Sequence, residues 1–283
     1  MKGYIVRNRY YTDEGMDYVF RRMGEEFARH GVGCEVVAPM MSFGGDGVLT
    51  ADIPDGDFAI FWDKDAVLNA AVAKKMRCFN TAAAIAVCDD KVKTFAALDG
   101  LAPVPRTLPA PLMYPASDKT DEAYLAAVEA LGFPLIVKER AGSRGEQVHL
   151  VRDAAALKAL YERIRHVPFQ AEEYIAGGEH DMRLYVVGGR FAGAVARQGR
   201  DFKSNVYAGA DVTAAHPPAA LIRLAERIAA RLGLDYCAAD FIGTDKPVLV
   251  EVNSNAYFTG AEACGLDIAG RYAAHIMEAV RCS

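Results

Sequence analysis

The sequence has few of the patterns that mark secreted, zinc-binding or hydrolytic proteins. Its six cysteines include no CxxC pair, so neither a disulfide framework nor a structural zinc site has a spacing to support it. Its six histidines are scattered, with no HExxH motif, and no serine lies in a nucleophile-elbow sequence. We therefore expect reduced, buried cysteines, and we assign no histidine a role.

Long apolar runs are also lacking. The longest, 82–88, is far shorter than the roughly 20 residues that span a bilayer. At the N-terminus, charged residues appear too early for the apolar region of a signal peptide. The chain shows no internal repeat and no low-complexity segment. We expect a cytoplasmic protein with no membrane partner.

Positive charge is not in excess. Lysine and arginine number 32 against 37 aspartates and glutamates, for a net charge of −5. This balance argues against nucleic acid or an anionic membrane as the main partner, although it leaves room for a local basic pocket. With 52% apolar and 24% charged residues, the composition is that of a globular protein and excludes disorder, collagen-like repeats and coiled coil. A length of 283 residues suggests one large domain or two to three small ones.

Residues 1–88 are predicted to form an α/β domain. Short runs of β-formers alternate with helical patterns in a β-α-β-β-α-β order, which is typical of a parallel sheet with helices on its faces. The expected strands are 3–7, 34–38, 58–62 and 77–80. The expected helices run from Thr12 or Asp13 to about 30, and from 64 to 76.

Residues 89–175 have the pattern of a small α+β unit. A short helix at 89–98 carries two lysines, and the prolines of 100–111 mark an extended connector because their spacing excludes a continuous helix. The other expected helices are 122–131 and 153–166, and the expected strands are 133–139, 147–152 and 169–175.

Residues 176–283 form the last predicted unit. Gly188-Gly189 is a strong hairpin signal between two strands. The strands expected in this unit are 182–187, 190–197, 236–242 and 247–253. A polar loop at 198–211 precedes a helix that starts at Pro217 or Pro218 and ends at Gly233, and a final helix covers 267–280.

Two acidic residues, Asp240 and Glu251, lie inside strands that are otherwise apolar. A buried carboxylate is costly unless it has a partner. Glu251 and Asn253 are two residues apart and share one strand face, and a hairpin that pairs 240 with 251 would add Asp240 to that face. Three oxygen ligands of this kind suit Mg²⁺. The alternative is a surface hairpin with ordinary solvated acids.

Cations and glycines precede these strands. Lys138 ends an apolar strand, and Lys91 and Lys93 lie on the short helix at 89–98. Lysine is a good partner for phosphate, although each of these alone is more typical of a solvated surface. The turn 141–148 can present backbone N–H groups to a phosphate, or it can be a plain hairpin turn. The polar segment 197–205 carries cations that suit anionic groups, or it is a plain mobile loop.

In order, these motifs resemble the ATP-grasp superfamily, and within it the RimK-like carboxylate–amine ligases, which include the α-L-glutamate ligases. They span residues 90–253. The motifs are Asp90-Lys91, Phe133-Pro-Leu-Ile-Val-Lys138, Gly142-Ser-Arg-Gly145, Glu173-Tyr-Ile175, Asp181-Met-Arg183, Asp201-Phe-Lys203-Ser-Asn205, Asp240 and Glu251-Val-Asn253. The resemblance implies an N-terminal α/β domain (1–88) and a two-subdomain α+β ATP-grasp fold, whose central (89–175) and C-terminal (176–283) subdomains clasp ATP.

The resemblance also implies roles for particular residues. Those implied to bind the nucleotide are Lys91 and Lys138 at the α- and β-phosphates, Ser143 in the glycine-rich turn, Glu173, Tyr174 and Ile175 at the adenine, Asp181 at the ribose, and Lys203, Ser204 and Asn205 at the γ-phosphate. Asp240, Glu251 and Asn253 would hold two Mg²⁺ or Mn²⁺ ions, with Glu251 bridging them. Arg183, Arg197 and Lys203 are the catalytic candidates, the two arginines for orienting the carboxylate or stabilising an acyl phosphate.

The implied reaction joins a carboxylate to an amine. The carboxylate of a small molecule, peptide or carrier protein attacks the γ-phosphoryl group, and an amine such as glutamate or another amino acid then displaces phosphate. Within the fold, a kinase is an alternative, and a nucleotide-binding protein without turnover is another. The resemblance leaves the substrates, the choice between Lys91 and Lys93, and a homo-oligomeric state open.

Three departures from the family pattern bear on specificity. Glu146 follows Gly145 where relatives commonly have another glycine, and Lys203 replaces the arginine of the glutamate ligases. The segment 254–258 replaces a Pro-Gly that lies near the amine site in relatives. The last departure leaves the identity of the amine open.

Overall fold

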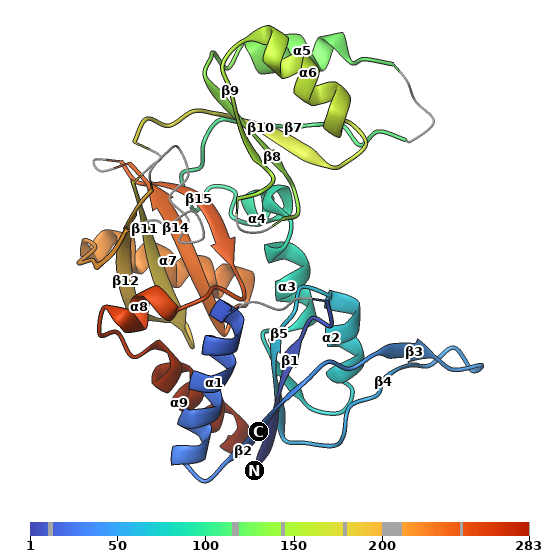
Figure 1. Ribbon diagram of the computed structural model, residues 1–283, viewed down its shortest axis with the longest axis vertical. Coiled ribbons are helices and arrows are strands. Elements are labelled where there is room, and N and C mark those ends of the chain that lie inside the picture. The colour runs from blue at the N-terminus through green and yellow to red at the C-terminus, as the bar shows by residue number, and fades with distance from the viewer. Residues whose placement is uncertain are drawn as a thin grey trace.

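The computed structural model describes residues 1–10, 14–114, 119–142, 145–177, 180–199, 211–243 and 246–282. Three sheets of four or five strands organise these residues, with a central lobe above an N-terminal and a C-terminal sheet (Figure 1). Among the described residues, no helix combines the length and apolar character needed to cross a membrane. All six cysteines are free thiols. Cys78, Cys88 and Cys237 are buried as expected, whereas Cys34 and Cys264 are partly buried and Cys282 is exposed.

The N-terminal sheet is parallel, which confirms the α/β prediction. Its strand order is β2-β1-β5-β6, and the strands are β1 (Lys2–Arg7), β2 (Gly33–Val37), β5 (Phe58–Trp62) and β6 (Arg77–Phe79). The helices are α1 (Glu14–Arg29), α2 (Ala66–Val72) and α3 (Ala82–Cys88). The apolar side of α1, with Val19, Phe20, Met23 and Phe27, is buried as its periodicity predicts.

The sequence analysis missed a hairpin in this region. Strands β3 (Met41–Phe43) and β4 (Leu49–Ala51) form a two-stranded arm that projects from the body (Figure 1). Each strand has three residues, which is too short for a clear alternation of apolar and polar side chains. Helix α2 is also shorter than predicted, because the chain turns after the cap at Ala73.

The central lobe is an antiparallel sheet in the order β7-β10-β8-β9, covered by two helices. The strands are β7 (Thr107–Pro109), β8 (Leu135–Glu139), β9 (Val148–Val151) and β10 (Phe169–Glu173), and the helices are α5 (Glu122–Glu129) and α6 (Ala154–Ile164). Asp153 caps α6 by accepting a hydrogen bond from the backbone N–H of Ala156 at 2.8 Å. The rings of Tyr124, Tyr161 and Phe169 pack together in a core that belongs to this lobe alone.

The C-terminal sheet has the order β13-β12-β11-β14-β15 and is antiparallel. Its strands are β11 (His180–Val187), β12 (Arg190–Gln198), β13 (Asp211–Ala214), β14 (Tyr236–Ile242) and β15 (Val248–Asn253), with helices α7 (Ala219–Leu232), α8 (Thr259–Ala263) and α9 (Ile268–Arg281). The predicted hairpin turn is present, with φ of 56° at Gly188 and 72° at Gly189. A Cβ on Gly188 would lie 2.5 Å from Nδ1 of His275. Its positive φ and this close contact therefore both require glycine at position 188.

Each face of the C-terminal sheet packs against different elements. Helix α7 covers one face, together with the apolar residues of α3 and Leu98 after α4 (Lys91–Ala97). Helices α8 and α9 cover the other face and join it to α1 and the N-terminal sheet in a continuous core. The rings of Trp62, Tyr236 and Phe258 meet in this core. The fold class is confirmed, and the boundaries at 88 and 175 stay predictions.

Phe258 tests how strongly this shared core holds the two sheets together. It is fully buried and makes an edge contact with Trp62 at a centroid distance of 6.1 Å. We expect Phe258→Ala to lower the free energy of unfolding by about 3–5 kcal/mol, because it leaves a cavity where the two sheets meet. Phe43→Ala, at the exposed hairpin arm, is the control and should change it by less than about 0.5 kcal/mol. Urea unfolding followed by circular dichroism measures both; equal effects would contradict a shared core.

Candidate active site

A cavity of about 930 Å³ lies where the three sheets meet. Its volume is that of a ligand site. The predicted site residues that line it are Lys91, Lys138, Glu173, Tyr174, Ile175, Asp181, Arg183, Arg197, Asp240, Glu251 and Asn253. Four others, Ser143, Lys203, Ser204 and Asn205, lie outside the described residues. The folding of distant segments thus brings together every predicted site residue that the structure describes.

The hairpin of β14 and β15 has the register that places three candidate metal ligands on one face. Asp240 pairs with Glu251, and Asn253 follows two residues later. Asp240 is only 3% exposed, which argues against the alternative of a solvated surface hairpin. Burial alone would raise the pKa of Glu251, but the positive charges of Lys91 and Lys64 hold it below its usual value.

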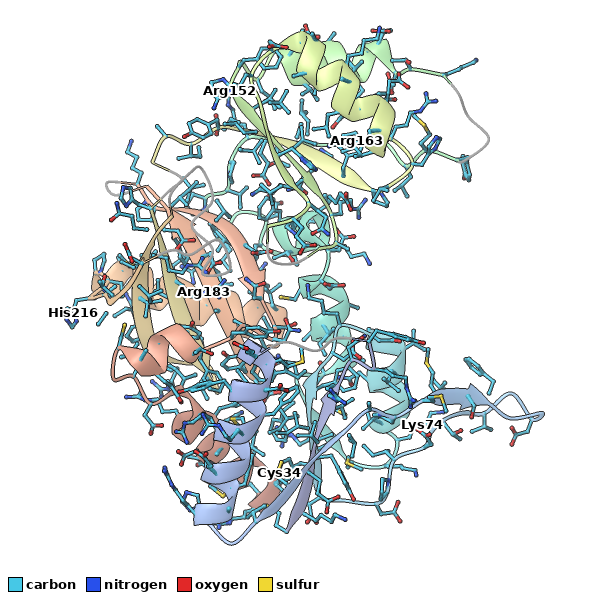
Figure 2. The ribbon with its side chains drawn as sticks, in the orientation of Figure 1. Cys34, Lys74, Arg152, Arg163, Arg183 and His216 are labelled. Carbon is cyan, nitrogen blue, oxygen red and sulfur yellow. The ribbon has the colours of Figure 1, made fainter. Side chains whose placement is uncertain are left out.

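Two arginines donate hydrogen bonds to the Asp240 carboxylate. Arg183 donates from Nε and Nη2 to its two oxygens, both at 2.7 Å, and Arg197 Nη2 donates to Oδ2 at 2.9 Å. Arg183 is marked on the C-terminal sheet in Figure 2. Although burial favours the neutral acid, these two guanidinium groups lower the pKa of Asp240. The carboxylate is therefore ionised at neutral pH.

The carboxylate and amide groups fit a divalent metal ion in part. Asn253 Nδ2 is buried without a hydrogen-bond partner among the described residues, and Glu251 contacts Lys91 only loosely, at 3.5 Å. Both side chains can therefore turn an oxygen to a hard cation. Asp240 can do so only by sharing its oxygens with the arginines. Within the described ranges, no group of three or more histidine, cysteine, aspartate or glutamate side chains is arranged to hold a metal ion.

The cations of the cavity come from different elements. Lys91, in the first turn of α4, lines the cavity, whereas Lys93 is exposed and is not among the lining residues. Lys138 Nζ lies 2.7 Å from Oε2 of Glu172. Glu172 was not predicted, although Gln170 pairs with Lys138 in the register of β8 and β10, and residue 172 follows on the same face. Glu172 is 2% exposed and depends on Lys138 for its countercharge.

Lys64 is a third lysine of the cavity, and the sequence analysis missed it. Its Nζ lies 2.7 Å from Oδ1 of Asp89 and donates to the carbonyl of Gly142 at 3.1 Å. Burial would lower the pKa of Lys64, but the negative charges of Asp89 and Glu251 raise it. The available signal was its place just after β5, since ligands bind beyond the carboxyl ends of parallel strands.

The side chain of Glu173, a residue that the family resemblance places at the adenine, points to Arg106. Its two oxygens accept from the backbone N–H and Nε of Arg106, at 2.8 and 2.6 Å. These hydrogen bonds lower the pKa of Glu173. The carboxylate is therefore held by Arg106, while Tyr174 and Ile175 follow it along the cavity wall. This arrangement is compatible with a contact to the adenine through the backbone.

Asp90 links the central lobe to the C-terminal sheet. Its carboxylate caps α4 at the N–H of Val92 and accepts from Nε and Nη2 of Arg140, at 3.0 and 2.6 Å. Arg140 directly follows β8 in the lobe, whereas α4 packs beside α7. Burial would raise the pKa of Asp90, but the bonds from Arg140 and the backbone N–H of Lys93 hold it below its usual value.

Comparisons with known proteins show which family the chain resembles. A family model described as the RimK-like ATP-grasp domain matches residues 88–276. A probable alpha-L-glutamate ligase of Stenotrophomonas maltophilia (strain K279a) is 35% identical over 150 residues, 50% of this chain and 51% of that protein. Beta-citrylglutamate synthase B of Danio rerio is 34% identical over 210 residues, 70% of this chain and 50% of that protein. The chain thus spans about half the length of these curated relatives.

The similarity extends to a solved structure. The chain superimposes on the crystal structure of an ATP-grasp RimK domain protein from Sphaerobacter thermophilus DSM 20745. The TM-score is 0.75 and the sequence identity is 26%. The superposition covers 98% of this chain and 100% of that chain. The likeness therefore includes the N-terminal sheet, which the family model leaves out.

The link between Asp90 and Arg140 predicts a pH-dependent stability. The pKa of Asp90 is lowered in the folded protein from an unfolded value of about 3.9, so the link stabilises the protein above that value. As the pH falls through the folded pKa, this contribution is lost. We expect Asp90→Asn, which can still cap α4, to cost about 1–2 kcal/mol at pH 7 and progressively less below pH 4.

Asp153→Asn is the matched control, because Asp153 caps α6 and has no arginine partner among the described residues. It should cost less than about 0.5 kcal/mol at pH 7, since asparagine caps helices nearly as well as aspartate. Urea unfolding between pH 7 and pH 3 measures both variants. A deficit in Asp90→Asn that does not change with pH would argue against the ion pair.

Proposed function

Because the chain belongs to the RimK-like ATP-grasp family, we propose that it is an ATP- and Mg²⁺-dependent ligase that joins a carboxylate to an amine. One observation carries the proposal: lysines from the central lobe and α4 face oxygen-bearing side chains of the C-terminal sheet across a single cavity. Phosphates next to a divalent cation need this combination of charges. The names of the curated relatives support glutamate or another amino acid as the amine.

In this proposal the nucleotide lies between the central lobe and the C-terminal sheet. Lys91 and Lys138 neutralise its phosphates, and residues 173–175 of the cavity wall lie along the adenine. Lys64 holds the glycine-rich turn through the carbonyl of Gly142. Glu251 and Asn253, with a shared oxygen of Asp240, would hold the metal ion, which when bound neutralises phosphate charge. Ser143, Lys203, Ser204 and Asn205 remain predictions for the phosphate side.

The chemistry proceeds in two steps. An oxygen of the substrate carboxylate attacks the γ-phosphorus, a C–O–P linkage forms, and the bond to the β-phosphate oxygen breaks to release ADP. The amine then attacks the acyl carbon, the C–N bond forms, and phosphate leaves while the amine loses a proton. Arg183 and Arg197 lie at the cavity wall, where they can orient the carboxylate and stabilise the acyl phosphate.

Lys138 tests the nucleotide site. A nucleotide at 100 times its Kd stabilises the folded state by about 2.7 kcal/mol. We expect Mg-ADP to raise the melting temperature of the wild type but not of Lys138→Met. Because Lys138→Met leaves the buried Glu172 without its countercharge, it should also lower the stability without ligand.

The double variant Lys138→Met/Glu172→Gln separates these effects. It removes both charges and should recover the stability without ligand, yet still lack the response to Mg-ADP. Lys158→Met is the control, because Lys158 is an exposed lysine of α6 that pairs with Glu122; its response should equal that of the wild type. A wild type that does not respond to any nucleotide would refute the nucleotide site.

Trapping the acyl phosphate tests the reaction. Hydroxylamine converts an acyl phosphate into a hydroxamate, so wild-type protein with ATP, Mg²⁺, hydroxylamine and a panel of carboxylates should form one hydroxamate for each ADP. Glu251→Gln, which removes a charged metal ligand, should slow this at least about 100-fold, or about 2.7 kcal/mol in the barrier. Mass spectrometry and coupled ADP detection give both quantities. A phosphorylated product without hydroxamate would indicate a kinase instead.

A further inference from the structure

Four charged side chains form an alternating row on one face of the C-terminal sheet. They are Asp181 and Arg183 on β11, Arg197 on β12 and Asp240 on β14. Asp181 lies opposite Arg197, and Arg183 lies opposite Asp240. Residues two apart on a strand share a face, so the register places all four side chains together. All four line the cavity.

Arg197 joins the two halves of this row. It donates from Nε to Asp181 Oδ1 at 2.6 Å, from Nη2 to Asp181 Oδ2, and from Nη2 to Asp240 Oδ2 at 2.9 Å. Asp181 thereby holds the guanidinium by two parallel hydrogen bonds, and Asp240 accepts a third hydrogen bond from Nη2. The two N–H groups on Nη1 make none of these contacts, and the side chain lies at the cavity wall.

Burial makes this arrangement costly. Arg197 is 5% exposed and Asp181 is 8% exposed. Buried ion pairs seldom stabilise a protein more than apolar residues of the same volume would. The charges of the four groups cancel, which permits their burial, but stability alone does not account for keeping them beside a cavity. The need to hold the guanidinium groups in fixed directions accounts for these charged groups beside the cavity.

We infer that Asp181 is a positioning residue, which fixes Arg197 so that this arginine and Arg183 bind the phosphoryl oxygens of the acyl phosphate. This inference rests on the proposed function. It assigns Asp181 a role other than the ribose contact that the family resemblance implies, and it is carried by the two hydrogen bonds that the carboxylate accepts from Arg197. The bidentate geometry fixes the orientation of the Arg197 guanidinium, and without the charge of Asp181 that orientation is no longer fixed.

Two ligands separate the possible roles of Asp181. Mg-ADP reports the nucleotide site, and acetyl phosphate, added to protein saturated with Mg-ADP, reports the site of the acyl phosphate. We expect Asp181→Asn to bind Mg-ADP within twofold of the wild type and acetyl phosphate at least tenfold more weakly. Arg197→Met should show the same separation. Glu122→Gln, an exposed substitution on α5, should leave both affinities unchanged. Titration calorimetry measures each Kd.

A second variant keeps the test valid if Asp181→Asn does not fold. Asp181→Asn/Arg197→Met removes one charge of each sign and leaves the pair of Arg183 with Asp240 intact. It should retain Mg-ADP affinity, which a contact of Asp181 with the nucleotide would not allow, while its loss of acetyl phosphate affinity reports the missing Arg197.

The other outcomes overturn the inference in different ways. Weaker binding of Mg-ADP to Asp181→Asn or to the double variant would place Asp181 at the nucleotide instead. Unchanged binding of both ligands, or an equal loss of both, would exclude a positioning role. A wild type that binds Mg-ADP but not acetyl phosphate would refute the inference alone. A wild type that does not bind Mg-ADP would refute the proposed function itself.

Discussion

Charge balance on one face of the C-terminal sheet is the constraint on which the site depends. Toward α8 and α9 that face carries Tyr185 and Tyr236 and belongs to the core. Farther along the same strands it carries aspartates and arginines and forms a wall of the cavity. Buried ions are tolerated only when they are paired and hydrogen-bonded. The register of β11, β12 and β14 supplies the pairs, so the sheet that stabilises the body also sets the directions of the charged groups.

The three sheets contribute unequally to this arrangement. The N-terminal and C-terminal sheets share a core, so the end of β5, with Lys64, has a fixed place beside the C-terminal sheet. The central lobe has its own core and reaches the rest through polar links, in which Arg140 contacts Asp90 and the carbonyl of Gly142 contacts Lys64. The cavity therefore has two walls held by apolar packing and one held by hydrogen bonds and ion pairs.

Local patterns in the sequence were sufficient to predict much of this. The alternation of short β-forming runs with helical patterns predicted the parallel sheet. The two-residue spacing of Glu251 and Asn253 predicted their shared strand face, and the hairpin of β14 and β15 has the pairing of 240 with 251 that adds Asp240 to it. Contacts between distant segments could not be predicted in this way. Neither the ion pair of Glu172 with Lys138 nor the reach of Lys64 to Gly142 leaves a periodic signal. The partner of Asp181 depends on the register shift between Tyr185 and Val186 in the hairpin of β11 and β12, which the predicted Gly188-Gly189 turn does not reveal.

The separate core of the central lobe has a consequence for how the protein opens. Segments that share a core lose their structure together, whereas a lobe with a core of its own can unfold as a unit while the rest stays folded. Backbone amides of β8 and β10 are thus able to exchange with solvent through an opening that leaves β1, β5 and β14 protected. The central lobe forms one wall of the cavity. Its local stability can therefore change without weakening the core that the N-terminal and C-terminal sheets share.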